Sequence, residues 1–261
     1  MKKKPIDYLI PLAKGFIPRK YHPNAGEIYR ICRSFLYIGN KFVCPCCGWH
    51  FRQFLTHGVK PRKNAKCARC DSMERHRLLW LYLKNKTNLF YDNLKVLHFA
   101  PEYIFQKTLR FMSNLDYISV DLNSPLAMVK VDITNILYED NSFDVILCSH
   151  VLEHVVDDQK ALRELFRILK HGGWAILQVP LSNECDKTFE DPSIVSPRDR
   201  EHIFGQKDHV RIYGRDFKDK LEKAGFSVKV DGYVRELGDD KIKKHGLSED
   251  QEIYFCTKLR P

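Results

Sequence analysis

Strand and helix patterns alternate along the chain from residue 94 to its end, and this alternation limits the fold to few architectures. Short apolar runs that predict strands lie at 94–99, 116–122, 128–133, 143–149, 174–180, 226–233 and 252–259. Amphipathic stretches that predict helices lie at 101–112, 157–171 and 215–224. We therefore expect a largely parallel sheet with helices on both faces and a ligand beyond the carboxyl ends of its strands.

Four cysteines precede this region in the pattern C-x2-C-x19-C-x2-C: Cys44, Cys47, Cys67 and Cys70. Two such pairs, separated by the length of a short hairpin, can place four thiolates at the corners of a tetrahedron around Zn²⁺. Cys46 lies inside the first pair as a spare or competing ligand. Free buried thiols and a redox pair are the alternatives. A closed four-sulfur site leaves no position open for a substrate, so we expect a zinc ion here to stabilise the fold.

The cysteine content also bears on the compartment. The sequence holds nine cysteines, its start "MKKKPIDYLIPLAKGF" lacks the features of a signal peptide, and no run of 18 apolar residues occurs. We therefore expect a cytoplasmic protein with reduced thiols and no transmembrane segment.

Charge divides the chain unevenly. Residues 1–90 contain 19 Lys and Arg against 4 Asp and Glu, whereas residues 91–261 contain 24 against 29. We expect four parts: a basic N-terminal segment at 1–42, a zinc-ribbon-like module at 43–71, a connecting helix at 72–90 and an α/β domain at 91–261. A basic front favours an anionic partner, such as nucleic acid, an acidic substrate or a lipid surface. The plain alternative is that the charge only keeps a small module in solution.

The first strand ends in "HFAP" (His98–Pro101), where dinucleotide-binding folds have a glycine-rich turn. Those glycines let the backbone close around a pyrophosphate, and S-adenosylmethionine (SAM) contains no phosphate. The missing glycines therefore argue against NAD more strongly than against SAM. Asp121 and the pair Asp132-Ile133 follow later strands, where they could hold ribose hydroxyls and adenine. Taken singly, each Asp could equally be a turn residue.

A longer stretch resembles a known family. "SFDVILCSHVLEHVVDDQKALRELFRILKHGGWAILQVP" together with "HVRIYGRDFKDKLEKAGF" resembles the class I SAM-dependent methyltransferases, in particular their type 11 branch. The resemblance covers roughly residues 94–260 and departs from the family at the first turn, where G-x-G is usual. It implies a Rossmann-like sheet of seven strands. The cysteine module with "ERHRLLWLYL" and "LHFAPE" is similar to a bacterial subgroup that carries an N-terminal zinc knuckle.

The resemblance also implies roles for individual residues. The turn from His98 to Pro101 should face the methionine end of SAM, Asp121 with Leu122 the ribose, and Asp132 with Ile133 the adenine. Cys148 and Ser149, with His150 after them, should lie near the sulfonium and the incoming nucleophile.

Methyl transfer needs a base only when the acceptor arrives protonated, and three histidines are candidates: His150, His154 and His209. A packed or capping role is the alternative for each. "HVLEH" also matches a zinc-protease pattern, which we reject because it follows a strand instead of lying inside a helix. Some methyltransferases resembling this chain carry E-x-x-E-H here and bind Mg²⁺. His150 replaces the first Glu, and because Mg²⁺ prefers oxygen ligands the sequence argues against that metal.

A polar segment at 181–214 separates the fifth strand from the last helix, and segments of this length are often lids or binding loops. At its end, Asp208, Arg211 and Tyr213 are candidate substrate-binding residues. Arg211 could pair with an acidic substrate group. The alternative is a surface loop that merely docks Tyr213.

The sequence thus favours a SAM-dependent methyltransferase that modifies an oxygen or nitrogen of a small-molecule or glycan-type acceptor, and the basic front favours an anionic acceptor. An RNA or ribosome methyltransferase whose basic zinc module binds phosphates is the second candidate. A catalytically silent adaptor with the same fold is the third.

Overall fold

The computed structural model describes residues 22–58, 61–182 and 184–261, and the expectations for the N-terminal start lie outside these ranges. The chain divides into two compact units. The knuckle unit comprises the described residues up to Trp80 together with Gly238–Ser248, and the sheet unit comprises Leu81–Leu237 and Glu249–Pro261. None of the helices in the described ranges has the length and apolar character needed to cross a bilayer.

The sheet unit is built on a seven-stranded sheet in the order β12-β13-β9-β8-β5-β6-β7. Its strands are β5 (Leu94–Phe99), β6 (Leu115–Asp121), β7 (Val129–Lys130), β8 (Phe143–Ser149), β9 (Leu169–Gln178), β12 (Ser227–Asp231) and β13 (Ile253–Thr257). Strands β5 to β9 pair in parallel, and β13 runs antiparallel to both of its neighbours. This confirms the expected seven-stranded, mostly parallel Rossmann-like sheet.

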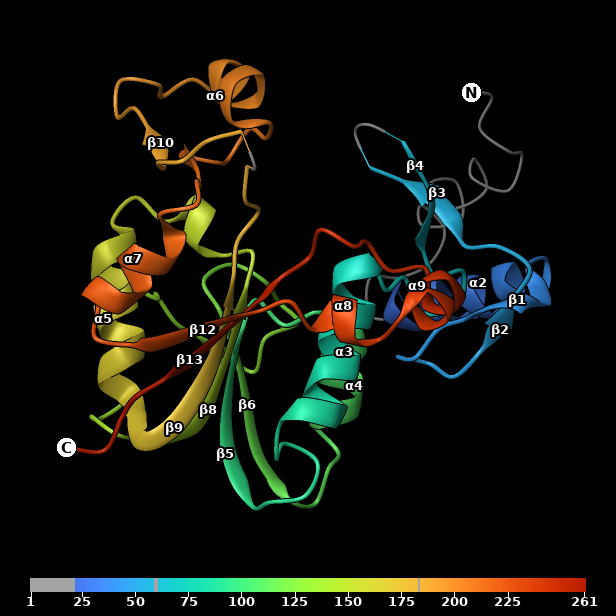
Figure 1. Ribbon diagram of the computed structural model, residues 1–261, viewed down its shortest axis with the longest axis horizontal. Helices are drawn as coiled ribbons and strands as arrows, with labels where there is room; N and C mark the ends of the chain where they lie inside the picture. The colour runs from blue at the N-terminus through green and yellow to red at the C-terminus, as the bar shows by residue number, and fades with distance from the viewer. Residues whose placement is uncertain (1–21, 59–60, 183) are drawn as a thin grey trace. The chain divides into compact units, whose positions relative to one another are not determined.

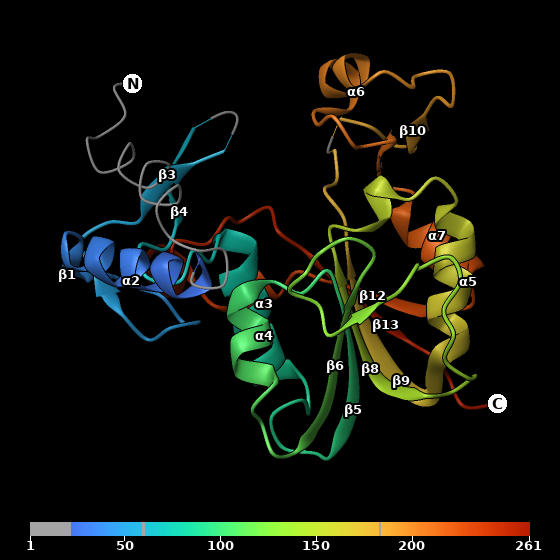
Figure 2. The ribbon, with the colours of Figure 1, turned by 180° about the vertical axis from the view of Figure 1, so that it is seen from behind.

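Helices cover both faces of this sheet (Figures 1 and 2). They are α4 (Tyr103–Leu109) on one face and α5 (Asp158–Ile168) and α7 (Phe217–Lys223) on the other, with the short α8 (Tyr233–Glu236) after β12. Helix α5 buries one apolar stripe, formed by Ala161, Leu162 and Leu165, against the strands. Burying a leucine side chain contributes about 1.5–3 kcal/mol, so this stripe fixes α5 on the sheet.

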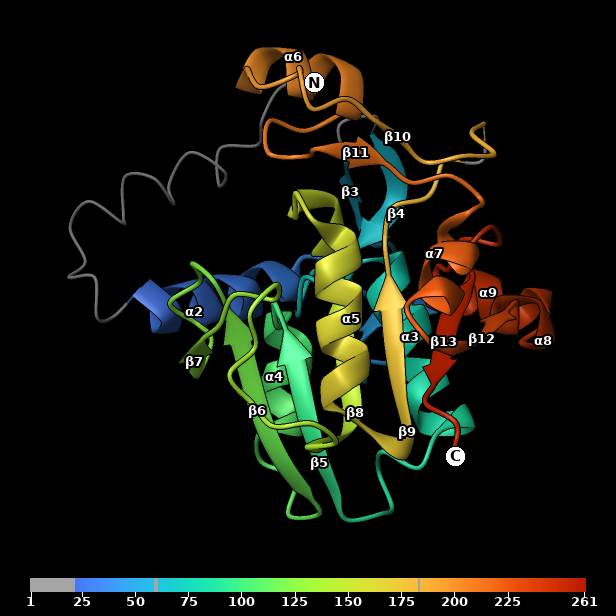
Figure 3. The same ribbon diagram turned by 90° about the vertical axis from the view of Figure 1, so that its left-hand side faces the viewer.

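A small subdomain follows β9 and lies beyond the carboxyl ends of the parallel strands (Figure 3). It contains β10 (Phe189–Glu190), α6 (Pro197–Phe204) and β11 (Arg211–Ile212). The sequence predicted only a polar loop here. Helix α6 forms because Ser196 caps it, accepting a hydrogen bond from the Asp199 amide, and Pro197 occupies its first turn.

The knuckle unit consists of short strands and helices. Its elements are α2 (His22–Phe35), β1 (Ile38–Val43), β2 (His50–Phe51), β3 (Leu55–His57), β4 (Arg62–Lys66), α3 (Glu74–Lys86) and α9 (Asp239–His245). Helix α3 lies inside the connecting helix predicted at 72–90 but is shorter at both ends, and its residues from Leu81 onward belong to the sheet unit. Strands β1 and β2 form one hairpin, and β3 and β4 form another.

Two predicted helix boundaries are wrong. Helix α4 begins at Tyr103 instead of Pro101, because Ala100 has a positive φ of 45° and Glu102 is still extended. Helix α5 ends at Ile168, and residues 169–171 belong to β9. Gly172 has a φ of 79°, and a Cβ on Gly173 would lie 2.9 Å from both Asp144 O and Lys170 O. The two glycines therefore lie inside β9, where they allow the irregularity at which the register between β8 and β9 shifts.

Candidate functional site

The carboxyl ends of four parallel strands lie in register at one edge of the sheet. Phe99 pairs with Val120 on one side and with Cys148 on the other, and Cys148 pairs with Leu177. The residues that follow these strands therefore emerge next to one another: the 98–101 turn, Asp121, and the segment from Ser149 onward. The predicted cofactor residues after β5, β6 and β8 are brought to this common edge.

The first turn takes a glycine-like shape without glycine. Ala100 has a φ of 45°, in the left-handed region that non-glycine residues seldom enter, and its amide donates to Val120 O at 2.9 Å. His98 is buried beneath the turn. Its Nδ1 lies 2.9 Å from Tyr117 Oη and its Nε2 lies 2.9 Å from Glu102 Oε2. Both ring nitrogens are thus held by protein partners, so His98 supports the turn from below.

The two predicted acidic residues cap their own turns. Asp121 Oδ1 accepts hydrogen bonds from the amides of Asn123 at 2.7 Å and Ser124 at 2.6 Å. Asp132 Oδ1 accepts from the Thr134 amide at 2.8 Å. Asp121 and Asp132 are therefore both turn residues, and each uses only its Oδ1 in these hydrogen bonds. The other oxygen of Asp121 is the atom that the ribose prediction requires.

The apolar residues that follow the two acids, Ile133 and Leu122, differ in solvent exposure. Ile133 is buried in the core of the sheet unit, whereas Leu122 is 47% exposed. Cys148, at the end of β8, is buried, and burial raises the pKa of its thiol. A neutral thiol is a poor nucleophile, so Cys148 contributes shape and not reactivity.

The three candidate histidines gather with Glu153 after β8. His150 has a φ of 58°, and its Nδ1 lies 3.2 Å from Glu153 Oε1. The rings of His154 and His209 meet edge to face with centroids 4.7 Å apart. His154 Nδ1 lies 3.2 Å from Asp208 Oδ2. His209 comes from the segment before β11, whose Val210 amide donates to Glu153 O.

Glu153 is the residue that the sequence reasoning did not select. It is 1% exposed and sits on the 3-10 turn η2 (Leu152–His154). The spacing H-x-x-E-H placed it next to two candidate histidines, and this was the available signal. Desolvation by burial lowers the pKa of His209, with the charges of Glu153 acting in the opposite direction.

Two of the predicted substrate residues are buried among protein partners. Arg211 is 3% exposed and donates to the carbonyl oxygens of Leu152, Val155 and Val156. Tyr213 is fully buried and donates to Asp158 Oδ2 at 2.8 Å. These contacts match the alternative considered from the sequence, a segment that docks onto the protein. They hold residues 152–158, and so the histidine cluster, in place.

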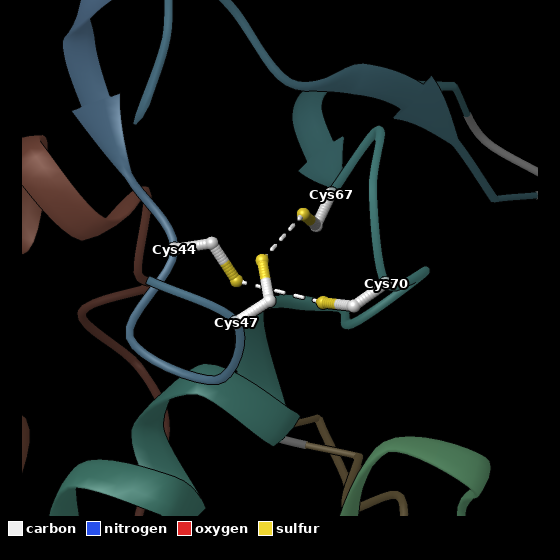
Figure 4. Close-up of side chains that lie close together, drawn as sticks. All are labelled: Cys44, Cys47, Cys67 and Cys70. Carbon is white, nitrogen blue, oxygen red and sulfur yellow. Dashed lines mark hydrogen bonds between the residues drawn. The ribbon is translucent and has the colours of Figure 1, made fainter. Parts of the chain in front are cut away.

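The four predicted zinc ligands come together in the knuckle unit (Figure 4). Cys44 Sγ lies 3.6 Å from Cys70 Sγ, and Cys47 Sγ lies 3.8 Å from Cys67 Sγ. A tetrahedral Zn²⁺ with bonds of about 2.3 Å requires sulfur separations of about 3.8 Å. Burial raises the pKa of the Cys67 thiol, with Cys44 adding to this effect, so this thiol would be costly to ionise without a metal. The donor set and its spacing fit zinc.

Neighbouring groups support this quartet. The Ser72 hydroxyl lies 3.2 Å from both Cys44 Sγ and Cys70 Sγ. Gly48 has a φ of 73°, and its amide donates to Cys44 O at 2.8 Å. The sulfur of Cys46 instead contacts His76 O at 3.6 Å, outside the group of four.

Arg77 on α3 ties the two sequence segments of the knuckle unit together. Its guanidinium is fully buried and donates to the carbonyl oxygens of Ala65 and Ser72 and to those of His245 and Gly246. It also lies 4.4 Å from the centre of the Phe54 ring. A buried cation held by carbonyl dipoles fixes α9 next to the cysteine loops.

Comparison with known proteins identifies the sheet unit. Residues 108–177 match the methyltransferase domain family of type 11. The chain is 27% identical over 124 residues to the ubiquinone/menaquinone biosynthesis C-methyltransferase UbiE of Vibrio campbellii, a match that covers 46% of each protein. It is 41% identical over 65 residues to UbiE of Idiomarina loihiensis, covering 24% of this chain and 26% of that one. The chain thus spans less than half the length of these relatives.

A solved structure with the same fold is that of the (4+2)-cyclase SpnF, with a TM-score of 0.51, 14% sequence identity, and coverage of 73% of this chain and 84% of that one. At this identity the likeness concerns the fold alone, since one fold can carry different reactions. Sheet order, family match and curated relatives nevertheless agree with one another. The sheet unit is thus similar to class I SAM-dependent methyltransferases, and its match to the type 11 branch covers residues 108–177.

Proposed function

We propose that the protein transfers a methyl group from SAM to an oxygen or nitrogen of a small-molecule or glycan-type acceptor, and that a structural zinc ion stabilises its knuckle unit. One observation carries the proposal. The ends of β5, β6 and β8 lie in register, and Ala100 gives the first of these ends a left-handed turn. This backbone shape is what glycine supplies in related folds, so the absence of glycine does not argue against SAM.

The cofactor would be held by the residues at this edge. The 98–101 turn would contact its amino-acid end, and the free oxygen of Asp121 its ribose. Asp132 and Ile133 would contact the adenine, and Cys148 and Ser149 would lie near the sulfonium. When bound, SAM supplies an activated methyl group on a good leaving group. The protein then has to align the acceptor atom with it, and alignment alone can lower such a barrier by about 7–11 kcal/mol.

The acceptor atom is suggested by the histidine cluster. His150 and His154 directly follow β8, where an acceptor would approach, and His209 packs against His154 from the segment before β11. An imidazole can remove a proton near neutral pH. A base is useful when the acceptor is a hydroxyl or a protonated amine. The names of the curated relatives describe C-methyltransferases, so transfer to carbon is the competing outcome within the same reaction class.

The charge of the chain suggests an anionic acceptor. The excess of Lys and Arg lies within residues 1–90. Such a field attracts acidic small molecules and also nucleic acid. RNA methylation therefore remains the second candidate function, and a silent adaptor that binds no SAM is the third.

Incubation of the full chain with SAM labelled in its methyl group and a cell extract tests these proposals. Label in small metabolites or lipid-linked sugars, bonded to oxygen or nitrogen, would support the first. Label in RNA would establish the second candidate, and label on carbon would correct the acceptor atom. Absence of both transfer and SAM binding in calorimetry would leave the adaptor.

A further inference from the structure

The cluster after β8 has features that the proposed reaction does not require. Glu153, His154 and His209 each offer one ligand atom, and these three atoms lie within 4.8 Å of one another. Glu153 and His154 are neighbours on η2, whereas His209 arrives from the far end of the subdomain that follows β9. Two separate segments thus converge on one small volume beside the cofactor edge.

Two of these side chains are buried with polar atoms left unsatisfied. Glu153 is 1% exposed and His209 is 5% exposed. Among the described residues, neither Glu153 Oε2 nor His209 Nε2 has a hydrogen-bond partner. Leaving such an atom unsatisfied costs about 1–3 kcal/mol, and more for a charged group. A cation placed between the two atoms would remove both penalties together.

The remaining contacts of the cluster resemble those around metal ligands. His154 Nδ1 lies 3.2 Å from Asp208 Oδ2, which leaves Nε2 as its donor toward the cluster. His209 forms a hydrogen bond to the Phe204 backbone through its ring, and Nε2 is again the remaining nitrogen. Ligating histidines usually have their second nitrogen fixed in this way, by a carboxylate or a carbonyl group.

We propose that Glu153, His154 and His209 bind a divalent transition-metal ion, separate from the cysteine site. Two imidazoles and one carboxylate suit Zn²⁺, Fe²⁺ or Co²⁺ better than Mg²⁺, which prefers oxygen ligands. Three protein ligands leave at least one coordination position open. An oxygen-bearing ligand can occupy that position, so hydroxyl or carboxylate groups are the chemical class that the site would take. His150 contacts Glu153 Oε1 and would orient this carboxylate from behind.

Metal binding can be measured without SAM or acceptor, so it is independent of the proposed reaction. The full chain is dialysed against a chelator until one zinc per chain remains, and is then titrated with Co²⁺. We expect one further Co²⁺ per chain with weak visible bands and no intense sulfur-to-cobalt absorption, since the ligands are nitrogen and oxygen. Cobalt that enters only with the intense sulfur band would occupy the cysteine site and overturn the proposal.

Variants locate the ion. E153Q keeps the size of the side chain but removes the carboxylate, and H154A and H209A each remove one ligating nitrogen. All three variants should abolish the weak visible bands of the added cobalt. D208N should weaken cobalt binding by about 10–100-fold through loss of the carboxylate behind His154. H202A alters an exposed histidine on α6 and serves as the matched control. A cooperative thermal unfolding transition of the sheet unit like that of wild type shows that each variant is folded. Equal cobalt affinity in E153Q, H209A and wild type would disprove the site.

Discussion

Glu164 and Arg167 form a two-pronged ion pair one turn apart on α5, with Arg167 Nε and Nη2 each 2.8 Å from a carboxylate oxygen. Glu164 Oε2 also accepts from the Ile136 amide at 2.9 Å, and Arg167 donates to Ile136 O and Tyr138 O at 2.8 Å each. The pair therefore anchors the loop that carries Asp132 and Ile133 to a rigid helix.

The pH dependence of stability should report this pair. The Arg167 hydrogen bond holds the pKa of Glu164 below its ordinary value, so the charged pair stabilises the fold above the unfolded-state pKa and loses this effect as the pH falls. We expect E164Q to lower the free energy of unfolding by about 1–3 kcal/mol at pH 7. The difference should shrink below a pH of about 4.3. Urea unfolding of wild type and E164Q at pH 7 and at a pH below about 4.3 measures the difference in the free energy of unfolding, with E139Q at an exposed position as the control. A loss that is independent of pH would contradict the assignment.

The left-handed turn at Ala100 predicts that two substitutions there differ in their effect on stability. A left-handed backbone costs a non-glycine residue about 1–2 kcal/mol. Glycine removes this cost but makes the unfolded chain more flexible by about 0.4–1 kcal/mol. We expect A100G to unfold within a few degrees of wild type and to keep its SAM affinity. A100V should unfold at lower temperature, because a β-branched residue avoids positive φ. Equal melting temperatures for A100V and wild type would show that residue 100 does not have a left-handed backbone.

The ribose role of Asp121 can be separated from its turn role. D121N keeps the Oδ1 acceptor for the amides of Asn123 and Ser124 but replaces the free carboxylate oxygen with an amide. A hydrogen bond to a charged group contributes about 1.5–3 kcal/mol, so SAM affinity should fall roughly tenfold to hundredfold. Calorimetry with SAM measures this loss, and D116N on the exposed part of β6 is the control. Unchanged affinity in D121N would mean that the ribose lies elsewhere.

Loss of one cysteine ligand should destabilise the knuckle unit. Because binding of structural zinc contributes directly to folding, C44S should lose its zinc and expose the knuckle unit to protease. C32S changes an exposed cysteine outside the group of four and should keep one zinc per chain. Zinc analysis and limited proteolysis provide the readouts. Full zinc content in C44S would exclude Cys44 as a ligand.

The parts predicted well from sequence were those fixed by local pattern. Strands β5 and β8 have the predicted bounds because each is a mostly apolar run in the middle of a parallel sheet. The cysteine quartet followed from spacing alone. Helix α9 was missed because its sequence "DDKIKKH" buries only Ile242 and shows no apolar stripe.

Other features depended on contacts between distant residues. The end of α5 was placed too late because "LKHGG" resembles a helix terminus, whereas these residues already belong to β9 and its glycines lie at an irregularity in that strand. The meeting of His154 with His209 could not be inferred, since a whole subdomain separates them along the chain. The buried state of Arg211 and Tyr213 likewise depends on their tertiary partners on residues 152–158.

Arg77 links the order of synthesis to the order of folding. Its carbonyl partner His245 lies 168 residues later in the chain. At a translation rate of about 5–20 residues per second, that partner leaves the ribosome roughly ten to thirty seconds after Arg77. The knuckle unit therefore reaches its final form only after nearly all of the methyltransferase sheet has been synthesised. A nascent chain halted before α9 would carry a guanidinium that lacks its acceptors on His245 and Gly246.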